Sequence, residues 1–222
     1  EQYRQRYGDK VLVFDKDDYI NIIDTGDNNQ KKNTVLFARN ACYDLAESVG
    51  VKWILQLDDD YVDFRFKYNA EFESGDKIVR KNLGQIFLIT LQYFKSIPAA
   101  SIAYSQGGDF IGGKDGQAHL GVWAKRKVMN TFFLTTERRM AFIGRMNDDV
   151  NTYIVHGSRG LIMFQTSQFA VNQVQTQASE GGLTEMYLQN GTYQKSFYTA
   201  MMAPSCVKIS TMGSKERRLH HQ

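Results

Sequence analysis

The chain has 222 residues, 42% of them hydrophobic, so it can bury a sizeable core, and we expect one domain over residues 1–222. Its formal net charge of +3 is too small to indicate nucleic-acid binding, because phosphate contacts need a concentrated basic patch. No apolar run is long enough to span a membrane, and the two cysteines lack metal-ligand spacing, which predicts free thiols in a reducing, cytoplasmic compartment.

Two patterned segments precede the middle of the chain. Val11–Phe14 is strand-like, and a helix is predicted over residues 36–49 with Gly50 as its stop. Its apolar positions recur at helical spacing: Phe37, Ala38, Ala41, Cys42, Leu45, Ala46 and Val49. Arg39 and Asn40 lie in the first turn, where free backbone N–H groups favour anions, so a planar cation here suits a diphosphate. Taken alone, Arg39 would be an ordinary surface arginine.

The apolar run Trp53–Leu57 ends in three consecutive aspartates, Asp58, Asp59 and Asp60. An apolar run bounded by a change to charge predicts a buried strand. Adjacent carboxylates repel one another and lose hydration, and hard cations such as Mg²⁺ and Mn²⁺ compensate them because they prefer oxygen ligands. The end of a strand in an α/β sheet is also a common ligand site. The alternative is a solvated acidic turn.

Later segments predict further helices and strands. An amphipathic helix is expected over residues 79–96, strands over residues 99–104 and 160–166, and another helix from about residue 180 to near Gly191. Two glycine pairs around residues 110–111 predict a loop with unusual backbone angles or a close backbone approach to a ligand, or else an ordinary hairpin. Asn147, followed by Asp148 and Asp149, predicts a helix N-cap and an acidic first turn.

Ala38-Arg39-Asn40, the helix that carries them and Leu57–Asp60 resemble the core of a glycosyltransferase with the GT-A fold. The opening segment, residues 1–8 followed by the strand-like run, is similar to the same family. Among its branches the combination most resembles the TET-associated glycosyltransferases, encoded largely in phages beside TET/JBP-type oxygenases. The resemblance implies an α/β fold with a GT-A-like (Rossmann-like) mixed sheet flanked by helices. The resemblance leads us to expect that the chain starts after the usual first β-α unit, which would be lacking, supplied by another segment or chain, or placed elsewhere in a rearranged order.

The resemblance implies metal-dependent transfer of a sugar from a nucleotide-sugar, by preference a UDP-sugar, to a hydroxyl group. Asp58 and Asp60 would hold Mn²⁺ or Mg²⁺, Asp58 and Asp59 would also contact the donor, and Arg39 and Asn40 would bind it. From the branch, the acceptor would be a hydroxymethylated pyrimidine in phage DNA, which would place the enzyme in the host cytoplasm with no membrane partner.

The resemblance also gives roles to the acidic pair and to a late histidine. Asp149 would accept the proton of the attacking hydroxyl, with Asp148 as the close second, because an alcohol attacks well only when a base takes its proton. Single displacement would then invert the anomeric carbon. His220, barely ahead of His221, would complete the metal site, whereas His156 is expected to be structural. The alternative for the acidic pair is a helix cap alone.

Several other functions stay open. Aspartate clusters also serve two-metal chemistry, so a metal-dependent nuclease or phosphotransferase is one alternative. A sugar transferase acting on protein or glycan is another, and a catalytically silent nucleic-acid-binding module is a third. Basic clusters with aromatics, such as Arg65–Tyr68, fit a DNA backbone but more often form a solvated face.

Overall fold

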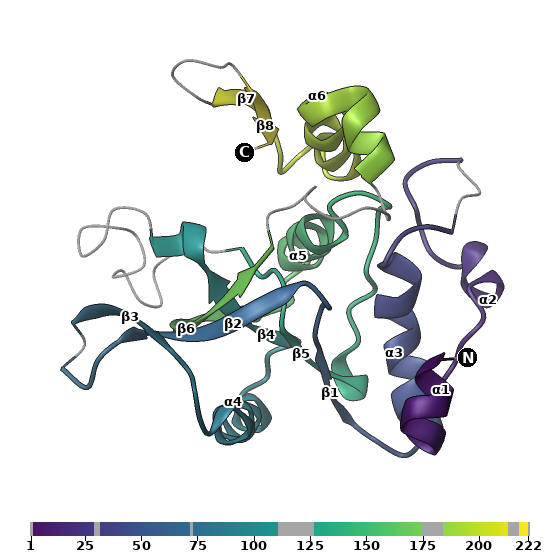
Figure 1. The fold of residues 1–222 in the computed structure, drawn as a ribbon. Helices are drawn as coiled ribbons and strands as arrows, with labels where there is room; N and C mark the ends of the chain where they lie inside the picture. Colours follow the sequence, from purple (N-terminus) through teal and green to yellow (C-terminus); the bar gives the residue numbers. More distant parts are fainter. Residues whose placement is uncertain are drawn as a thin grey trace.

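The computed structural model describes residues 2–28, 32–71, 73–110, 127–174, 184–212 and 218–221. Within them, a mixed sheet has the strand order β1-β5-β4-β6-β2-β3, and β7 pairs with β8 separately (Figure 1). The strands are β1 (Trp53–Gln56), β2 (Tyr61–Tyr68), β3 (Ser74–Ile78), β4 (Ser101–Gln106), β5 (Phe132–Thr135), β6 (Met163–Gln173), β7 (Ile209–Met212) and β8 (Arg218–His221). The helices are α1 (Gln2–Tyr7), α2 (Asp17–Ile20), α3 (Leu36–Ser48), α4 (Leu83–Ser96), α5 (Asp148–Ser158) and α6 (Thr184–Met202).

The strand directions bring the ends of several strands to one edge of the sheet. β4 and β6 run parallel, and every other neighbouring pair in this sheet is antiparallel. β1, β4 and β6 therefore end at the same edge, and β2 and β5 begin there. The turn between β1 and β2, which carries the three aspartates, lies at this edge. The mixed sheet with flanking helices is the α/β class predicted from the sequence.

Alternate side chains of the central strands separate two apolar clusters on opposite faces of the sheet. In β5, Phe133 packs with α4, whereas Phe132 and Leu134 pack with α3. In β4, Tyr104 lies on the α4 side and Ala103 on the α3 side. α4 therefore covers one face, and α3 with α5 covers the other (Figure 1).

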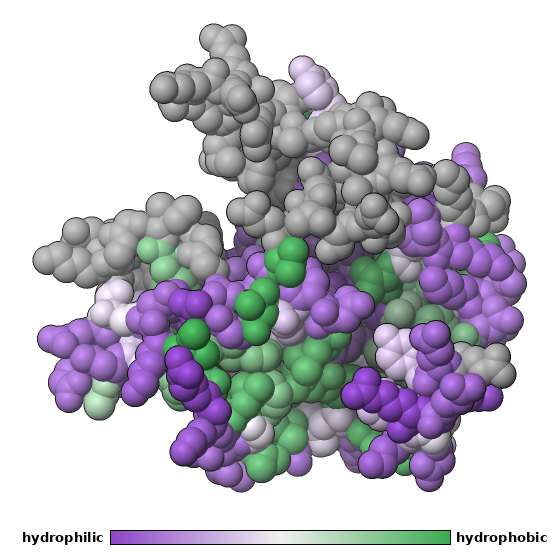
Figure 2. Space-filling view, viewed as in Figure 1, coloured by the Kyte–Doolittle hydropathy of each residue, from purple (hydrophilic) through white to green (hydrophobic). Residues whose placement is uncertain are grey.

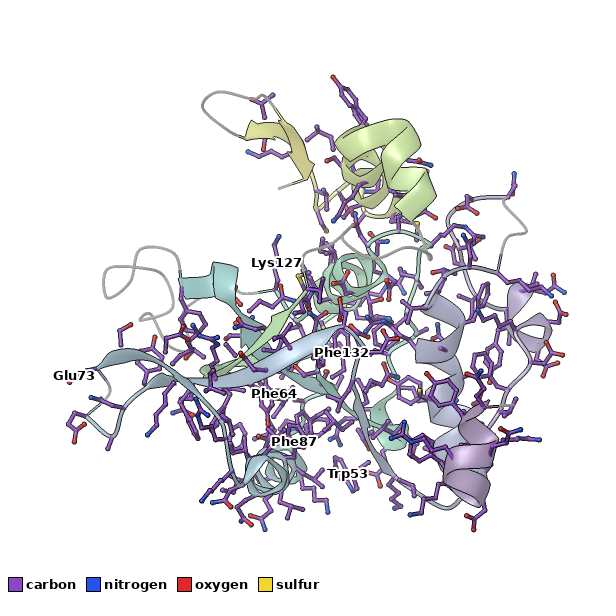
Figure 3. All side chains as sticks on the ribbon, viewed as in Figure 1. Trp53, Phe64, Glu73, Phe87, Lys127 and Phe132 are labelled. Carbon is purple, nitrogen blue, oxygen red and sulfur yellow. The ribbon has the colours of Figure 1, made fainter. Side chains whose placement is uncertain are left out.

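The cluster beneath α4 is largely aromatic. Trp53 meets Phe94 edge-on with ring centroids 5.2 Å apart, and Phe64 meets Phe87 at 5.5 Å. Figure 3 shows the labelled members of this group between β1, β2 and α4. Edge-to-face contacts of this kind add about 0.5–1.5 kcal/mol to the burial of the rings. In Figure 2 the apolar surface of this region is flanked by hydrophilic residues of the β2–β3 hairpin and of α1 and α2.

The helix and the strand predicted before the three aspartates are confirmed, with one difference in burial. α3 ends at Ser48, and Gly50 adopts a φ of +71°, as expected of a glycine stop. β1 forms as predicted, but its residues are half-buried rather than buried. The reason is that β1 is an edge strand, so only one of its sides is covered by a neighbour.

Other predictions need correction. The strand expected over Val11–Phe14 is wrong: these residues lie between a 3₁₀ turn and α2 without a sheet partner, and Val13 is 62% exposed. The amphipathic helix begins at Leu83 instead of residue 79, after Asn82 in a left-handed conformation. β6 continues to Gln173 and α6 to Met202, both beyond their predicted ends.

The glycine-rich loop is described only in part, as a 3₁₀ turn over Gly107–Phe110, and its continuation lies outside the described residues. In the described chain, no helix has the length and apolar character needed to cross a membrane.

Removing the ring of Phe94 tests the α4 interface. Phe94 is fully buried, so Phe94→Ala should lower the free energy of unfolding by about 3–5 kcal/mol through lost burial and a residual cavity. Its neighbour Tyr93 is 55% exposed, and Tyr93→Ala should change the same quantity by no more than about 0.5 kcal/mol. Urea denaturation of both variants measures the difference, and equal losses would contradict the assigned interface.

Candidate functional site

The three aspartates after β1 differ in exposure. Asp58 and Asp60 are half-buried, while Asp59 between them is exposed. The backbone carbonyl of Asp60 accepts the N–H of Val174 at the end of β6, at 3.0 Å, which fixes the turn to the neighbouring strand. Asp60 Oδ1 is buried and makes no hydrogen bond within the described part of the chain. The turn therefore directs Asp58 and Asp60 inward and leaves Asp59 to solvent.

Arg39 of α3 joins this turn to the start of α5. Its Nη2 lies 3.2 and 3.3 Å from the two carboxylate oxygens of Asp58. Its Nε lies 2.8 Å from Asp148 Oδ2, although the N–H is not aligned for a hydrogen bond. The Arg39 side chain is 9% exposed. The structure thus brings together three of the residues predicted from separate segments, and it does so around one buried guanidinium.

Aromatic rings line the guanidinium of Arg39. Its Cζ lies 5.0 Å from the centroid of the Phe132 ring and 5.5 Å from that of Phe142. Ring faces carry partial negative charge and attract a cation, more strongly when water is excluded. Gln56, the last residue of β1, donates its side-chain N–H to the Arg39 carbonyl at 2.8 Å, which ties the helix to the strand. These contacts hold Arg39 in place from several sides.

The acidic pair begins α5 as predicted. Asn147 precedes the helix in a left-handed conformation, with φ of +54°, but its side chain does not cap the helix. Asp148 is buried and faces Arg39, while Asp149 is half-buried and accepts the N–H of Val150 at 2.8 Å. Only one member of the pair is therefore ion-paired with Arg39.

The electrostatics of the site follow from an excess of carboxylates. Burial raises the pKa of Asp60, and Asp58 raises it further. Burial also raises the pKa of Asp148 to about 7, with Arg39 opposing the shift and Asp149 adding to it. Burial alone would lower the pKa of Arg39, but Asp148 and Asp58 together raise it above its ordinary value. One guanidinium does not balance the carboxylates around it, so a further cation would be stabilised here.

Asn40 has a structural role in the geometry observed. Its amide nitrogen donates to the carbonyl of Phe142 at 2.9 Å and to that of Leu36 at 3.0 Å. Its amide oxygen accepts the N–H of Phe142, also at 2.9 Å. Asn40 thus clamps α3 to the segment before α5, and the donor contact predicted for it stays a prediction.

Of the histidines considered from the sequence, only His156 has a side chain that the structure describes. His156 Nε2 is 2.8 Å from the carbonyl oxygen of Ala141, which agrees with a structural role. His220 pairs with Ser210 in the β7–β8 hairpin, and its side chain lies outside what the structure describes, so its metal role stays a prediction. Among the described residues, no group of three or more His, Cys, Asp or Glu side chains is placed to hold a metal ion.

Sequence reasoning missed residues at the beginning of β5 and β2. Asn130 and Thr131 both have positive φ, at +60° and +45°, directly before β5. The Thr131 N–H donates to the hydroxyl of Tyr61, the first residue of β2, at 2.8 Å. Positive φ is rare for a β-branched residue and marks local strain of a kind that clusters at functional sites. No sequence signal pointed to Thr131, because the threonine gives no hint of this conformation.

Replacing Asp148 tests whether folding raises the pKa of its carboxyl group. Since the folded-state pKa of about 7 lies above the unfolded value, ionising Asp148 removes stability as pH rises from about 4 through about 7. Asp148→Asn removes this penalty. We expect the free energy of unfolding of the variant, relative to the wild type, to increase between about pH 5 and about pH 8. Chemical denaturation at both pH values measures this, and a difference independent of pH would contradict it.

Comparison with known proteins identifies the family. The family model described as TET-Associated Glycosyltransferase matches residues 1–182, which include the aspartate turn, Arg39 and the start of α5. No curated protein and no solved structure gives a match. The family match covers most of the chain, and it agrees with the resemblance of the Arg39 helix and the aspartate turn. The chain belongs to the TET-associated glycosyltransferase family.

Proposed function

We propose that the chain transfers a sugar from a nucleotide-sugar donor to a hydroxyl acceptor, with a divalent cation held by Asp58 and Asp60. The observation that carries the proposal is the convergence of the β1–β2 turn and the first turn of α5 on Arg39. Such a convergence sets candidate metal ligands beside a candidate base. Membership of a glycosyltransferase family favours sugar transfer over the nuclease, phosphotransferase and binding-module alternatives.

The turn has the chemistry that Mn²⁺ or Mg²⁺ requires. Both inward carboxylates are hard oxygen donors, and the buried Oδ1 of Asp60 is available for a ligand. Mg²⁺ commonly uses one or two protein carboxylates when substrate phosphates and water complete its shell, so a two-aspartate site is sufficient. Bound there, the cation would supply neutralisation of the charge that develops on the departing diphosphate.

Arg39 contributes through the carboxylates that it contacts. Its guanidinium is 9% exposed and lies against Asp58 and Asp148, so in this geometry it does not extend toward a ligand. It orients Asp58 for the cation and keeps the start of α5 close to the turn. The sequence predicted that Arg39 binds the donor. In this geometry Arg39 would do so indirectly, through the positive potential that it creates at the phosphates and through its contacts with Asp58 and Asp148.

Asp149 is the better placed of the acidic pair to act as the base. Asp148 is ion-paired with Arg39 and buried, whereas Asp149 is partly exposed beside it. In the proposed step the acceptor oxygen bonds to the anomeric carbon, the bond from that carbon to the diphosphate oxygen breaks, and Asp149 takes the acceptor proton. One displacement on one face inverts the anomeric configuration.

The proposed acceptor is a hydroxymethylated pyrimidine in DNA, and a UDP-sugar is the first donor to test. Membership of the TET-associated branch supports this acceptor. The basic cluster on β2 does not, because Arg65 pairs with Asp63 and Asp76, and Lys67 also pairs with Asp76. That cluster is therefore a neutralised face of the β2–β3 hairpin. Hydroxyl groups on protein or glycan are the alternative acceptors. A DNA acceptor also implies that the enzyme acts in the cytoplasm, which is part of the same proposal.

Donor binding tests the metal site. In a thermal-shift panel of nucleotide diphosphate sugars, we expect one donor to stabilise the protein only with Mn²⁺ or Mg²⁺ present, by about 2.7 kcal/mol at a hundredfold excess over Kd. Asp58→Asn and Asp60→Asn should abolish this stabilisation. Asp18→Asn, at an exposed acid of α2, should leave it unchanged. A full shift in the presence of EDTA would refute the metal site.

Replacing the base should separate chemistry from binding. Asp149→Asn should lower the transfer rate by about 10²–10⁴-fold while the donor-induced stabilisation persists, since the amide cannot accept the acceptor proton. Transfer to an oligonucleotide containing hydroxymethylcytosine, with unmodified DNA, a protein and a glycan as parallel acceptors, identifies the acceptor class. NMR of the product reports the anomeric configuration, and retention would rule out single displacement with Asp149 as base.

A further inference from the structure

α6 packs against α5 on the side away from the central sheet (Figure 1). All of this helix follows the family match, which ends at residue 182. Within its described side chains, the face toward α5 is buried, with Ser196 and Thr199 at 2% and 0% exposure and Tyr198 at 6%. α6 is thus an integral neighbour of the helix that begins with the acidic pair.

Asn147 is attached to α6 instead of capping its own helix. An asparagine before a helix ordinarily accepts a hydrogen bond from the first turn. Here its side-chain nitrogen donates to the carbonyl of Lys195 at 2.8 Å and to the hydroxyl of Thr199 at 2.9 Å. Asn147 is itself buried, so these bonds are shielded from water and expensive to lose. The residue directly before Asp148 is therefore fixed by the side of α6.

Tyr198 fixes the backbone slightly earlier in the same turn. Its hydroxyl accepts the N–H of Arg145 at 3.0 Å and contacts the carbonyl of Thr25 and the carboxylate of Asp27. Asp27 in turn accepts from Arg145 Nε at 2.9 Å, and the Arg145 side chain is 1% exposed. One hydroxyl thus links the loop at residues 25–27 to the segment that leads into α5.

The backbone around Tyr198 is built to admit its ring. Gly144 has φ of +82° and Gly26 has φ of +70°. A Cβ added to Gly26 would lie 2.8 Å from Met202 Sδ and 2.9 Å from the Tyr198 hydroxyl. One added to Gly144 would meet the Asn151 amide first, and would lie 3.2 Å from the Tyr198 ring. Both glycines are therefore required by conformation and by close approach. The match between α6 and this turn is specific.

We propose that α6 is a positioning element of the catalytic site, in which Tyr198 and Thr199 hold residues 144–147 and thereby aim Asp148 and Asp149. The inference rests on the proposed function, because it assumes that Asp149 takes the acceptor proton. A displacement of about 1 Å in a catalytic group costs about 10²-fold in rate, so a buried hydrogen-bonded brace at this turn has a direct kinetic consequence.

Lys195 adds a half-buried positive charge to α6. Burial lowers the pKa of its ammonium group, and Asp149 acts in the opposite direction, so the two charges lie near one another. Lys127 adds a second positive charge close by and lowers the pKa of Lys195 further. In Figure 3 the labelled Lys127 lies at the α5 side of the sheet.

A matched pair of substitutions tests the brace. Thr199→Val keeps the shape of the side chain and removes the hydroxyl that Asn147 contacts, while Thr199→Ser restores the hydroxyl. Tyr198→Phe removes a single oxygen and serves as the second variant should Thr199→Val fold poorly. Tyr193→Ala, at a 64% exposed position on α6, is the control. Hydrogen–deuterium exchange of the amides of residues 144–151 is measured for each protein, together with kcat and KM for the donor.

We expect exchange of these amides to be about 10-fold faster in Thr199→Val and Tyr198→Phe, and to return to the wild-type rate in Thr199→Ser. The value of kcat should fall about 10- to 100-fold in the first two variants, with KM for the donor within about twofold of the wild type. A purely structural role would lower the melting temperature without this split between kcat and KM.

Two results, both measured well below the melting temperature, would overturn the inference. One is amide exchange at the wild-type rate in both Thr199→Val and Tyr198→Phe. The other is faster exchange in these variants while kcat stays at the wild-type value. The role of Asp149 as the base is tested by a separate observation. It would be refuted if Asp149→Asn transferred the sugar at the wild-type rate. In that case the exchange measurement still decides whether α6 holds the turn.

Discussion

The structure of the site depends on burying one guanidinium among carboxylates. Arg39 lies within contact of Asp58 and Asp148, and the rings of Phe132 and Phe142 exclude water from it. Removing one partner of a buried ion pair leaves a charge without compensation, at a cost of about 3–5 kcal/mol. α3, the β1–β2 turn and α5 can therefore not shift independently. Their mutual position is set by charge as much as by apolar packing.

This arrangement divides the five acidic residues of the site by environment. Asp58 and Asp148 neutralise Arg39, Asp60 is partly buried with one unbonded oxygen, and Asp59 and Asp149 reach toward solvent. Carboxyl groups of identical chemistry thereby acquire different affinities for protons and cations. The separation of a metal-holding role from a proton-accepting role, as we propose it, needs no residue types beyond aspartate.

Local patterns allowed the individual parts of the site to be predicted. The periodicity of α3 with Gly50, the apolar run before Asp58 and the Asn-Asp-Asp start of α5 each define an element from a few neighbouring residues. Their meeting around Arg39 depends on strand order, which short patterns do not encode, so it followed only from the family resemblance. The strand predicted over Val11–Phe14 did not form, because a short apolar run without a sheet partner does not make a strand.

The role of Asn147 was missed for a related reason. From the sequence, an asparagine before two aspartates caps its own helix, and no nearby residue signals a partner on α6. The partner is distant along the chain, and the competing hydrogen bonds exist only in the folded protein. Local propensity is a sound guide to where α5 begins, and tertiary contacts decide what its first residues do.

The buried network under α6 also has a consequence for how the chain folds. Arg145 and Asp27 are 118 residues apart in sequence, and Tyr198 and Asp27 are 171 apart. Contacts of such long range are slow to form because the chain entropy must be lost before they stabilise anything. Until residue 198 has been synthesised, the turn before α5 lacks its Tyr198 partner. The acidic start of α5 is thus completed late, after the sheet can already have assembled.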